Sequence, residues 1–310
     1  MVMIRIAISG IGAVGGYYGG LLAHKYRNSS DVEVCFISRG ENMRVIKEDS
    51  LQIKTPGETL VAYPDIITDR PEEIGTVDFL LCCTKSYDLE ENLRCLTPVI
   101  GENTVVVPFL NGADITEQIE AILPSSEIWQ GCVYIGARLV GPGVVSKYSA
   151  KEHLFFGSEK VGQERQEELL QLLVDAGINA FNPTDITKRI WKKFFMISTA
   201  ATITSYYDRP IDEVIKTNYE AFKSLCVELK NLASAKGIQL EDDIIDTTLE
   251  TQKMMPPGSI TSMHHDFKQG KNTELENLTG YVVREAKRLN LEVPTYNMMY
   301  EALSTKQNQK

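Results

Sequence analysis

The sequence predicts two domains, a doubly wound α/β domain followed by an all-helical domain. Three observations lead to this prediction: a glycine-rich turn joins a strand to a helix near the N-terminus, strands and helices alternate up to residue 184, and helical periodicity prevails from residue 185. A chain of 310 residues is also longer than one hydrophobic core usually accommodates. We therefore expect a first domain at residues 1–184 and a second at residues 185–310.

The N-terminal stretch predicts a nucleotide-binding entrance. An apolar strand at residues 3–9 leads into glycines with G-x-G-x-x-G spacing, and a helix at 14–26 and a strand at 32–37 follow. An ordinary glycine turn is the alternative, but this order of elements favours a Rossmann-type βαβ unit, whose helix N-terminus binds a pyrophosphate. The residues expected to contact the cofactor are Gly10, Ile11, Gly12, Ala13, Val14 and Gly15.

The end of the second strand predicts which nicotinamide cofactor binds. Ser38 and Arg39 stand where an Asp or Glu would hold the ribose hydroxyls of NADH. An acid would repel a 2′-phosphate, whereas arginine offers it a planar set of N–H donors. The sequence therefore predicts NADPH, the alternative being a solvated surface arginine at this position.

Two later strands are expected to end in functional side chains. Apolar runs at 77–85 and 104–110 are typical of strands buried on both faces of a parallel sheet. Ligands collect at the carboxyl ends of such strands, so Lys85 and Asn111 are candidates for contact with the cofactor. The remaining expected elements are helices at 41–49, 88–96 and 163–175, a hairpin at 51–63, an antiparallel extension of the sheet at 127–158 and a strand at 178–181.

The helical domain contains a candidate proton donor. Lys192 and Lys193 interrupt a strongly apolar helix, and a lysine in an apolar wall can protonate a developing alkoxide, although either lysine could instead extend to solvent. Breaks between helices are expected at 208–210, 236–237, 256–258 and 293–294. The polar segment 259–274 is expected to be loop-like and to open the final helix at Thr273-Glu274.

Composition and motifs exclude several classes of protein. A net charge of −10 argues against a nucleic-acid partner. The six cysteines form no C-x-x-C pair, and the adjacent His264 and His265 have poor geometry for a shared metal ion, so no metal site is expected. No signal peptide and no membrane-spanning segment is recognised, so we expect a cytoplasmic protein without a membrane partner.

These motifs together resemble the ketopantoate reductase (2-dehydropantoate 2-reductase) family over nearly the full length. The resemblance implies a Rossmann domain followed by a 6-phosphogluconate-dehydrogenase-like helical domain, and NADPH-dependent reduction of 2-dehydropantoate to pantoate in pantothenate biosynthesis. The matching segments are the glycine motif through Gly19, Ser38-Arg39, Thr84-Lys85, 110–112, Ala137 with Pro142-Gly143, 191–193, 262–266 and 272–274.

The resemblance also assigns roles to individual residues. Its W-x-K motif selects Lys193 rather than Lys192 as the proton donor, and it makes Ala137 a cofactor contact. Asn111 would touch both nicotinamide and substrate, Ser262 would bind the substrate, and Glu274 would lie beside the nicotinamide ribose. The number of subunits is left open, a homodimer being one form considered.

Three departures concern the substrate. Members of the enterobacterial type carry substrate-binding asparagines where this chain has Ile197, Ala201 and Ile211. Losing three amides removes hydrogen bonds to a substrate hydroxyl and carboxylate, so a reductase of a more apolar 2-oxo acid is a second hypothesis. A third is a non-catalytic protein that binds or senses NADPH, against which Lys193, Ser262 and Glu274 argue.

Overall fold

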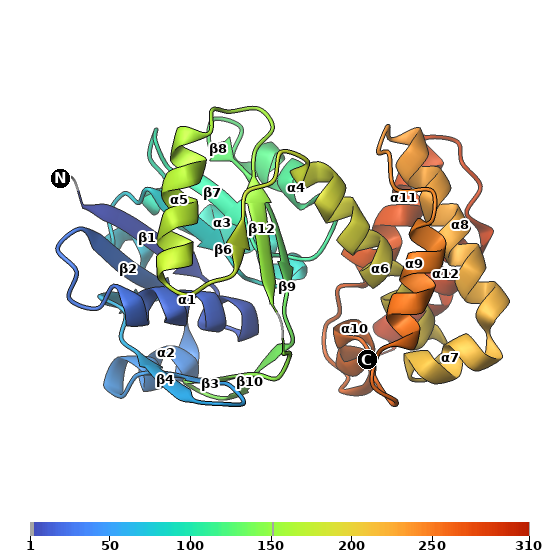
Figure 1. Cartoon of the computed structure of the whole chain (residues 1–310), viewed down its shortest axis with the longest axis horizontal. Helices are drawn as coiled ribbons and strands as arrows, with labels where there is room; N and C mark the ends of the chain where they lie inside the picture. The colour runs from blue at the N-terminus through green and yellow to red at the C-terminus, as the bar shows by residue number, and fades with distance from the viewer. Residues whose placement is uncertain (1–2, 151, 310) are drawn as a thin grey trace. The chain divides into compact units, whose positions relative to one another are not determined.

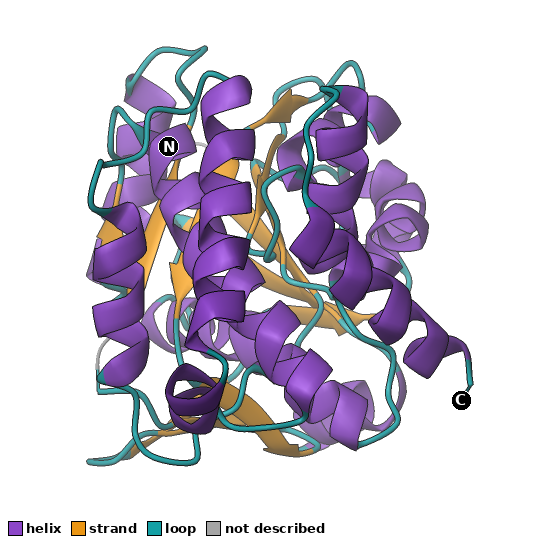
Figure 2. Ribbon diagram, turned by 90° about the vertical axis from the view of Figure 1, so that its right-hand side faces the viewer, coloured by secondary structure: helices purple, strands orange, loops and turns teal. Residues whose placement is uncertain are grey.

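The computed structural model describes residues 3–150 and 152–309 and divides into two compact units. The first consists of Met1–Leu110 and Ile115–Ile186, and the second of Asn111–Asp114 and Thr187–Lys310. All described strands belong to the first unit, and the second is helical (Figure 1; Figure 2). The loop that follows the strand at 105–108 therefore groups with the helical unit.

The first unit is organised around a parallel sheet whose strand order is β5-β2-β1-β6-β7-β8. Every neighbouring pair in this sheet is parallel. The order runs outward in both directions from β1, which confirms the predicted doubly wound fold. The strands are β1 (Ile4–Ser9), β2 (Val32–Ile37), β5 (Ile66–Thr68), β6 (Phe79–Cys82), β7 (Val105–Pro108) and β8 (Glu127–Ile128).

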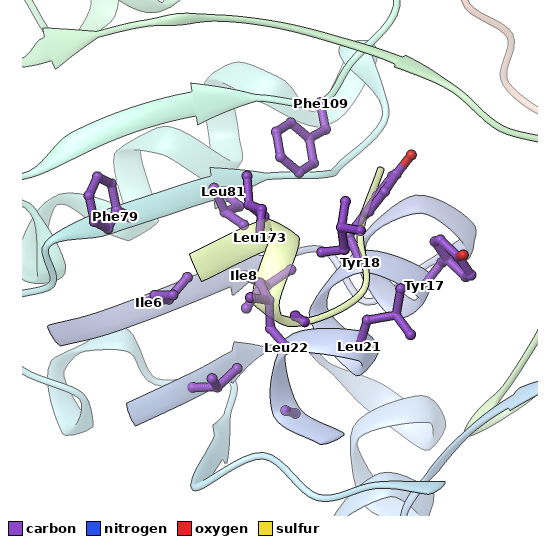
Figure 3. Packing of buried hydrophobic residues seen from close by; sticks show 14 of the residues in the cluster. Ile6, Ile8, Tyr17, Tyr18, Leu21, Leu22, Phe79, Leu81, Phe109 and Leu173 are labelled. Atoms are coloured by element: carbon purple, nitrogen blue, oxygen red, sulfur yellow. The ribbon is translucent and has the colours of Figure 1, made fainter. Parts of the chain in front are cut away.

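Helices cover both faces of this sheet because successive residues of a strand point to opposite sides. Ile6 and Ile8 of β1 belong to one core cluster, which includes residues of α1 and α5, whereas Ala7 belongs to another with residues of α3 and α4. Figure 3 shows Ile6 and Ile8 in the first cluster, with Ile8 near Leu22 of α1. The covering helices are α1 (Ala13–Lys25), α3 (Leu89–Leu96), α4 (Ile115–Ile122) and α5 (Glu164–Asp175), with α2 (Gly40–Glu48) after β2.

Two smaller sheets complete the first unit and correct one prediction. The segment 127–158 is not an antiparallel extension of the main sheet: β8 joins that sheet in parallel, and the other strands belong to two smaller sheets that also include strands from outside the segment. The predicted hairpin at 51–63 is confirmed as β3 (Leu51–Lys54) and β4 (Thr59–Ala62), and it pairs with β11. The remaining strands are β9 (Gln130–Tyr134), β10 (Ala137–Gly141), β11 (Val144–Lys147), β12 (His153–Gly157) and β13 (Ala180–Phe181).

The helices of the second unit pack around a shared core. Nearly every helix contributes aromatic and aliphatic side chains to it, including Phe194, Phe222 and Tyr296. The predicted breaks at 208–210, 236–237 and 256–258 lie between helices, and the break at 293–294 falls at the start of the last helix. The elements are α6 (Ile186–Tyr207), α7 (Ile211–Thr217), α8 (Tyr219–Ala235), α9 (Ile244–Lys253), α10 (Ser262–Lys268), the π-helix η4 (Glu276–Gly280), α11 (Tyr281–Arg288) and α12 (Pro294–Asn308).

The prediction that residues 259–274 form a loop is wrong for α10. Thr261 caps this helix by accepting a hydrogen bond from the backbone N–H of His264. Met263 and Phe267, four residues apart, are both buried in the core. This apolar pair is present in the sequence, but the polar residues around it conceal the helical pattern.

A partly buried ion-pair group links α8 to α11 and predicts how stability responds to acid. Glu285 accepts hydrogen bonds from Arg288 and from Lys236 at the end of α8. The Arg288 hydrogen bonds, joined by Lys236 and opposed by burial, lower the pKa of Glu285 from 4.5 to about 2. The folded protein therefore gains stability from this carboxylate above pH 4.5 and loses it as the pH falls toward 2.

Glu285→Gln is expected to lower the free energy of unfolding by about 1 kcal/mol at neutral pH. The difference from the unmutated protein should shrink as the pH is lowered below 4.5, because the carboxyl group is then protonated in the unfolded chain while it stays ionised in the folded protein. Urea unfolding between pH 7 and pH 3 measures this. Glu250→Gln, which removes an exposed pair with Lys253, is the control. A difference that stays constant over the pH range contradicts the assignment.

Candidate functional site

The glycine motif forms a tight connection between β1 and α1. Gly10 has a φ of +91°, a conformation that L side chains rarely adopt. A Cβ at Gly15 would lie 2.2 Å from the carbonyl oxygen of Gly10, so only glycine allows the helix to approach the turn this closely. By contrast, no atom lies within 4 Å of a Cβ placed on Gly12, and backbone is open to a ligand there. This geometry fits the roles expected for a turn that receives a pyrophosphate.

Two residues to which the sequence analysis assigned no role support this loop. Asn42 of α2 donates a hydrogen bond to the carbonyl of Ile11 and accepts one from the N–H of Gly143, both at 2.7 Å. Thr84, which follows β6, contacts the position of a Gly10 Cβ, and its hydroxyl is buried without a hydrogen-bond partner among the described residues. A buried hydroxyl without a partner fits a bound polar ligand at this turn. No sequence pattern distinguishes Asn42, whereas Thr84 stands next to a predicted strand end.

Ser38 and Arg39 follow β2 directly, as predicted. The backbone N–H of Ser38 donates to the carbonyl of Thr68, which ties the strand end to β5. Arg39 is exposed at the N-cap of α2 and makes no ion pair within the described part of the chain. An exposed guanidinium beside a helix N-terminus suits a phosphate group, because the guanidinium and the backbone at the helix N-terminus both present N–H donors.

Lys85 and Ala137 occupy less distinctive positions. Lys85 is half-buried and caps a short 3₁₀-helix at Ser86–Asp88, just beyond the carboxyl end of β6. Ala137 begins β10, where it pairs with Lys147 and packs against the core of the first unit. Both residues lie in the unit that carries the glycine motif.

The helical unit brings three predicted site residues into direct contact. The Nζ atom of Lys193 donates a hydrogen bond to Oδ1 of Asn111 at 2.7 Å, and Nδ2 of Asn111 lies 3.4 Å from Oε2 of Glu274. The Asn111 amide thus turns its oxygen to the lysine and its NH₂ group to the glutamate. In this orientation the amide oxygen accepts a hydrogen bond from Lys193 and the amide nitrogen donates one to Glu274. Lys193 and Glu274 are only 7% and 4% exposed.

This group of Lys193, Asn111 and Glu274 places a buried amine where it can act as an acid. An ammonium has three N–H donors, so the bond to Asn111 does not exhaust its capacity to bind a substrate oxygen. Burial among apolar residues of α6 excludes water and strengthens the electrostatic effect of the positive charge on a nearby oxygen. The arrangement can therefore hold a carbonyl oxygen and deliver a proton to it.

Lys192 has a different partner from Lys193. Its amine donates to Glu241 at 3.0 Å, and Lys188 lies 3.2 Å from the same oxygen. Although burial works in the opposite direction, hydrogen bonds from Lys192 and Lys188 lower the pKa of Glu241 to about 2. Lys192 thus belongs to a partly exposed ion-pair group, whereas the buried Lys193 contacts Asn111.

The π-helix η4 fixes the segment that carries Glu274. Its backbone carbonyl at Leu278 accepts a hydrogen bond from Ser198 of α6 at 2.7 Å, and Thr279 shares one with Thr202 at 2.7 Å. A single wide turn of this kind often accompanies functional sites. Here it joins the start of α11 to α6, the helix that contains Lys193.

Ser262 and the three departures lie elsewhere in the helical unit. Ser262 is exposed at the first position of α10. Ile197 is half-buried one turn beyond Lys193 on α6, and Ala201 and Ile211 are each only 2% exposed within the core. The latter two side chains therefore belong to the core, and all three positions offer methyl groups in place of amides.

The described residues contain no group of three or more His, Cys, Asp and Glu side chains placed to hold a metal ion. Across the same residues, no helix is both long enough and apolar enough to cross a bilayer.

Comparison with known proteins defines the class. Residues 6–160 match the family "Ketopantoate reductase PanE/ApbA", and residues 185–307 match its C-terminal domain, "Ketopantoate reductase PanE/ApbA C terminal". The crystal structure of 2-dehydropantoate 2-reductase from Porphyromonas gingivalis W83 is 40% identical with a TM-score of 0.87, over 97% of this chain and 99% of that one.

Two further relatives show the range of names among similar proteins. The uncharacterized oxidoreductase YkpB of Bacillus subtilis is 27% identical over 99% of this chain and 100% of its own length. A ternary structure of D-mandelate dehydrogenase with NADH and anilino(oxo)acetate is 25% identical with a TM-score of 0.86, over 99% of both chains.

The fold and these matches define an oxidoreductase of the class that uses a nicotinamide nucleotide and acts on CH–OH groups. Within that class, the chain belongs to the ketopantoate reductase family.

Proposed function

We propose that this protein reduces a small 2-oxo acid to the corresponding 2-hydroxy acid with NADPH, 2-dehydropantoate to pantoate being the leading reaction. The observation that carries the proposal is the 2.7 Å contact between the Lys193 amine and Asn111, with Glu274 beside it. The family match and the name of the P. gingivalis relative support the same substrate. We further propose that residues 1–184 form the NADPH domain and residues 185–310 the substrate domain.

The proposed roles follow from the chemistry of each side chain. When bound, NADPH supplies the hydride. Lys193 donates a proton to the carbonyl oxygen as that oxygen gains negative charge, and its ammonium stabilises the charge. Asn111 orients the amine and Glu274 orients Asn111 from its other side. Ser262 donates a hydrogen bond to the substrate carboxylate.

Support for NADPH comes from the first unit. Residues Gly10, Ile11, Gly12, Ala13, Val14 and Gly15 would hold the pyrophosphate, with Ala137 and Lys85 as further contacts. Ser38 and Arg39 would bind the 2′-phosphate, because Arg39 is exposed and no acid stands at the end of β2. The D-mandelate dehydrogenase structure is described with NADH, so a comparison of NADPH and NADH binding tests this part of the proposal.

A second candidate is reduction of a more apolar 2-oxo acid. Ile197 lies one turn from Lys193 and presents an aliphatic side chain that cannot hydrogen-bond a substrate hydroxyl. The D-mandelate dehydrogenase relative is described with anilino(oxo)acetate, an aryl-substituted oxo acid. The chemistry at Lys193 is the same in both candidates, and only the substrate side chain differs.

A panel of 2-oxo acids separates these functions. The purified protein is mixed with NADPH and with 2-dehydropantoate, phenylglyoxylate, 3-methyl-2-oxobutanoate or pyruvate, and loss of NADPH absorbance is followed. The highest kcat/KM with 2-dehydropantoate is the expected result. A preference for phenylglyoxylate or 3-methyl-2-oxobutanoate establishes the second candidate. NADPH binding without turnover of any 2-oxo acid overturns both and favours a sensing protein.

A further inference from the structure

A buried histidine outside the group of Lys193, Asn111 and Glu274 has no role in the chemistry described above. His264 lies on α10, and its side chain is 1% exposed. Its Nε2 atom lies 2.7 Å from Oδ1 of Asp208, the residue that follows α6. His264 thus joins α10, whose first residue is Ser262, to the end of the helix that carries Lys193.

The proton of this histidine can be assigned from its partners. Nδ1 of His264 is buried and has no hydrogen-bond partner among the described residues, whereas Nε2 faces a carboxylate oxygen. Because an ionised carboxylate oxygen can only accept, Nε2 carries a proton and donates it to Asp208. The hydrogen bond from His264 lowers the pKa of Asp208, which therefore stays ionised at neutral pH.

A chain of hydroxyl groups makes a second connection at the same place. Thr204 of α6 donates to the carbonyl of Ala200 at 2.7 Å, and its oxygen lies 3.2 Å from the hydroxyl of Thr261. Since each hydroxyl has one hydrogen, Thr261 donates to Thr204 and accepts from the N–H of His264. The N-terminus of α10 is thereby attached to α6 at Thr204.

The point of attachment lies on the same face of α6 as the proposed proton donor. Thr204 follows Lys193 by eleven residues, which is about three turns of helix. Ile197 and Ala200 occupy the intervening positions of this face. Ser262, directly after Thr261, therefore begins α10 beside the part of α6 that lies about three turns from Lys193.

We propose that His264 and Asp208 are positioning residues that fix α10 on α6, so that Ser262 meets the substrate carboxylate while Lys193 meets the carbonyl oxygen. This inference rests on the proposed function of Ser262 and Lys193. His264 and Asp208 touch neither substrate nor cofactor, and they act through the placement of Ser262.

The variant Asp208→Gly distinguishes a role of Asp208 in positioning Ser262 from a role in the stability of the fold. Asp208 has a φ of +52°, which glycine adopts more readily than aspartate, and its side chain is 56% exposed. The substitution therefore removes the carboxylate while relieving the backbone. KM for the 2-oxo acid is expected to rise about five- to tenfold, a size typical of coupling within one hydrogen-bond network, with kcat and the Kd of NADPH nearly unchanged.

Two variants of His264 and one distant variant serve as comparisons. His264→Leu should raise KM for the 2-oxo acid as Asp208→Gly does, whereas His264→Gln, which can still donate to Asp208, should restore most of the original value. Asn290→Gly makes the same kind of substitution at a φ of +53° after α11, and it should leave KM unchanged.

A double variant tests whether the effect passes through Ser262. In a Ser262→Ala background, Asp208→Gly should add little to KM, and an undiminished rise overturns the positioning role. Hydrogen exchange supplies a readout without substrate: amides of α10 should exchange faster in Asp208→Gly, while those of α6 near Lys193 should not. Absence of turnover in the unmutated enzyme sinks the proposed function instead. Unchanged KM and unchanged exchange in Asp208→Gly sink this inference alone.

Discussion

Lys193→Ala is expected to lower turnover of the 2-oxo acid by about 10²–10⁴-fold, the usual contribution of a positioned general acid. The amine is buried and held at 2.7 Å from Asn111, so no solvent group replaces it without rearrangement. NADPH binding should change little, because the residues expected to bind the pyrophosphate and the 2′-phosphate lie in the other unit of the chain. Single-turnover kinetics with saturating NADPH isolates the chemical step.

Lys192→Ala is the matched control for this prediction. Lys192 is adjacent in sequence and equally charged, but it pairs with Glu241, which keeps Lys188 as a partner after the substitution. We expect it to retain most of the activity. Equal losses in the two variants, or a larger loss for Lys192→Ala, contradict the assignment of Lys193. Lys193→Met, which keeps the apolar stem, should match Lys193→Ala if the amine is the functional group.

Arg39→Ala is expected to weaken NADPH binding by about 10- to 100-fold and to leave NADH binding nearly unchanged. The magnitude is that of hydrogen bonds to a charged group, about 1.5–3 kcal/mol. Arg39 is exposed beside the N-terminus of α2, where a phosphate would gain both the guanidinium and the helix dipole. Titration of cofactor fluorescence with each nucleotide gives the two dissociation constants.

Arg27→Ala provides the comparison for Arg39. Arg27 is likewise exposed in the first unit, but its guanidinium lies over the ring of Tyr63, 4.0 Å from the centroid. Its removal should affect both nucleotides equally and weakly. Equal affinities of the unmutated protein for NADPH and NADH would show that Arg39 does not bind the 2′-phosphate.

Much of the first unit could be predicted because its signals are local. Gly10 needs a positive φ that glycine adopts freely, and the apolar strands that end near Thr84 and Leu110 are buried on both faces of a parallel sheet. The strand 32–37 has the predicted bounds, α1 differs from prediction by one residue at each end, and α5 differs by one residue at its start. Such features depend on a residue and its near neighbours, which the sequence contains directly.

Strand partners and the helix α10 could not be predicted in the same way. The segment 127–158 contains the expected extended residues, but pairing with β3, β7 or β12 depends on what lies alongside after folding. Likewise α10 depends on burial of Met263 and Phe267 in a core supplied by distant helices. Local pattern limits the type of an element, whereas packing selects its neighbours.

The candidate site shows the same division. Sequence alone identified Lys193, Asn111 and Glu274 as separate candidates, through an apolar helix, a strand end and a family resemblance. Only the tertiary structure brings Lys193 within 2.7 Å of Asn111, 82 residues away, and attaches His264 to Asp208 across 56 residues. The physical reason is that residue type and spacing determine which chemistry a side chain can perform, but a hydrogen bond between distant residues exists only where the packed helices hold both partners in place.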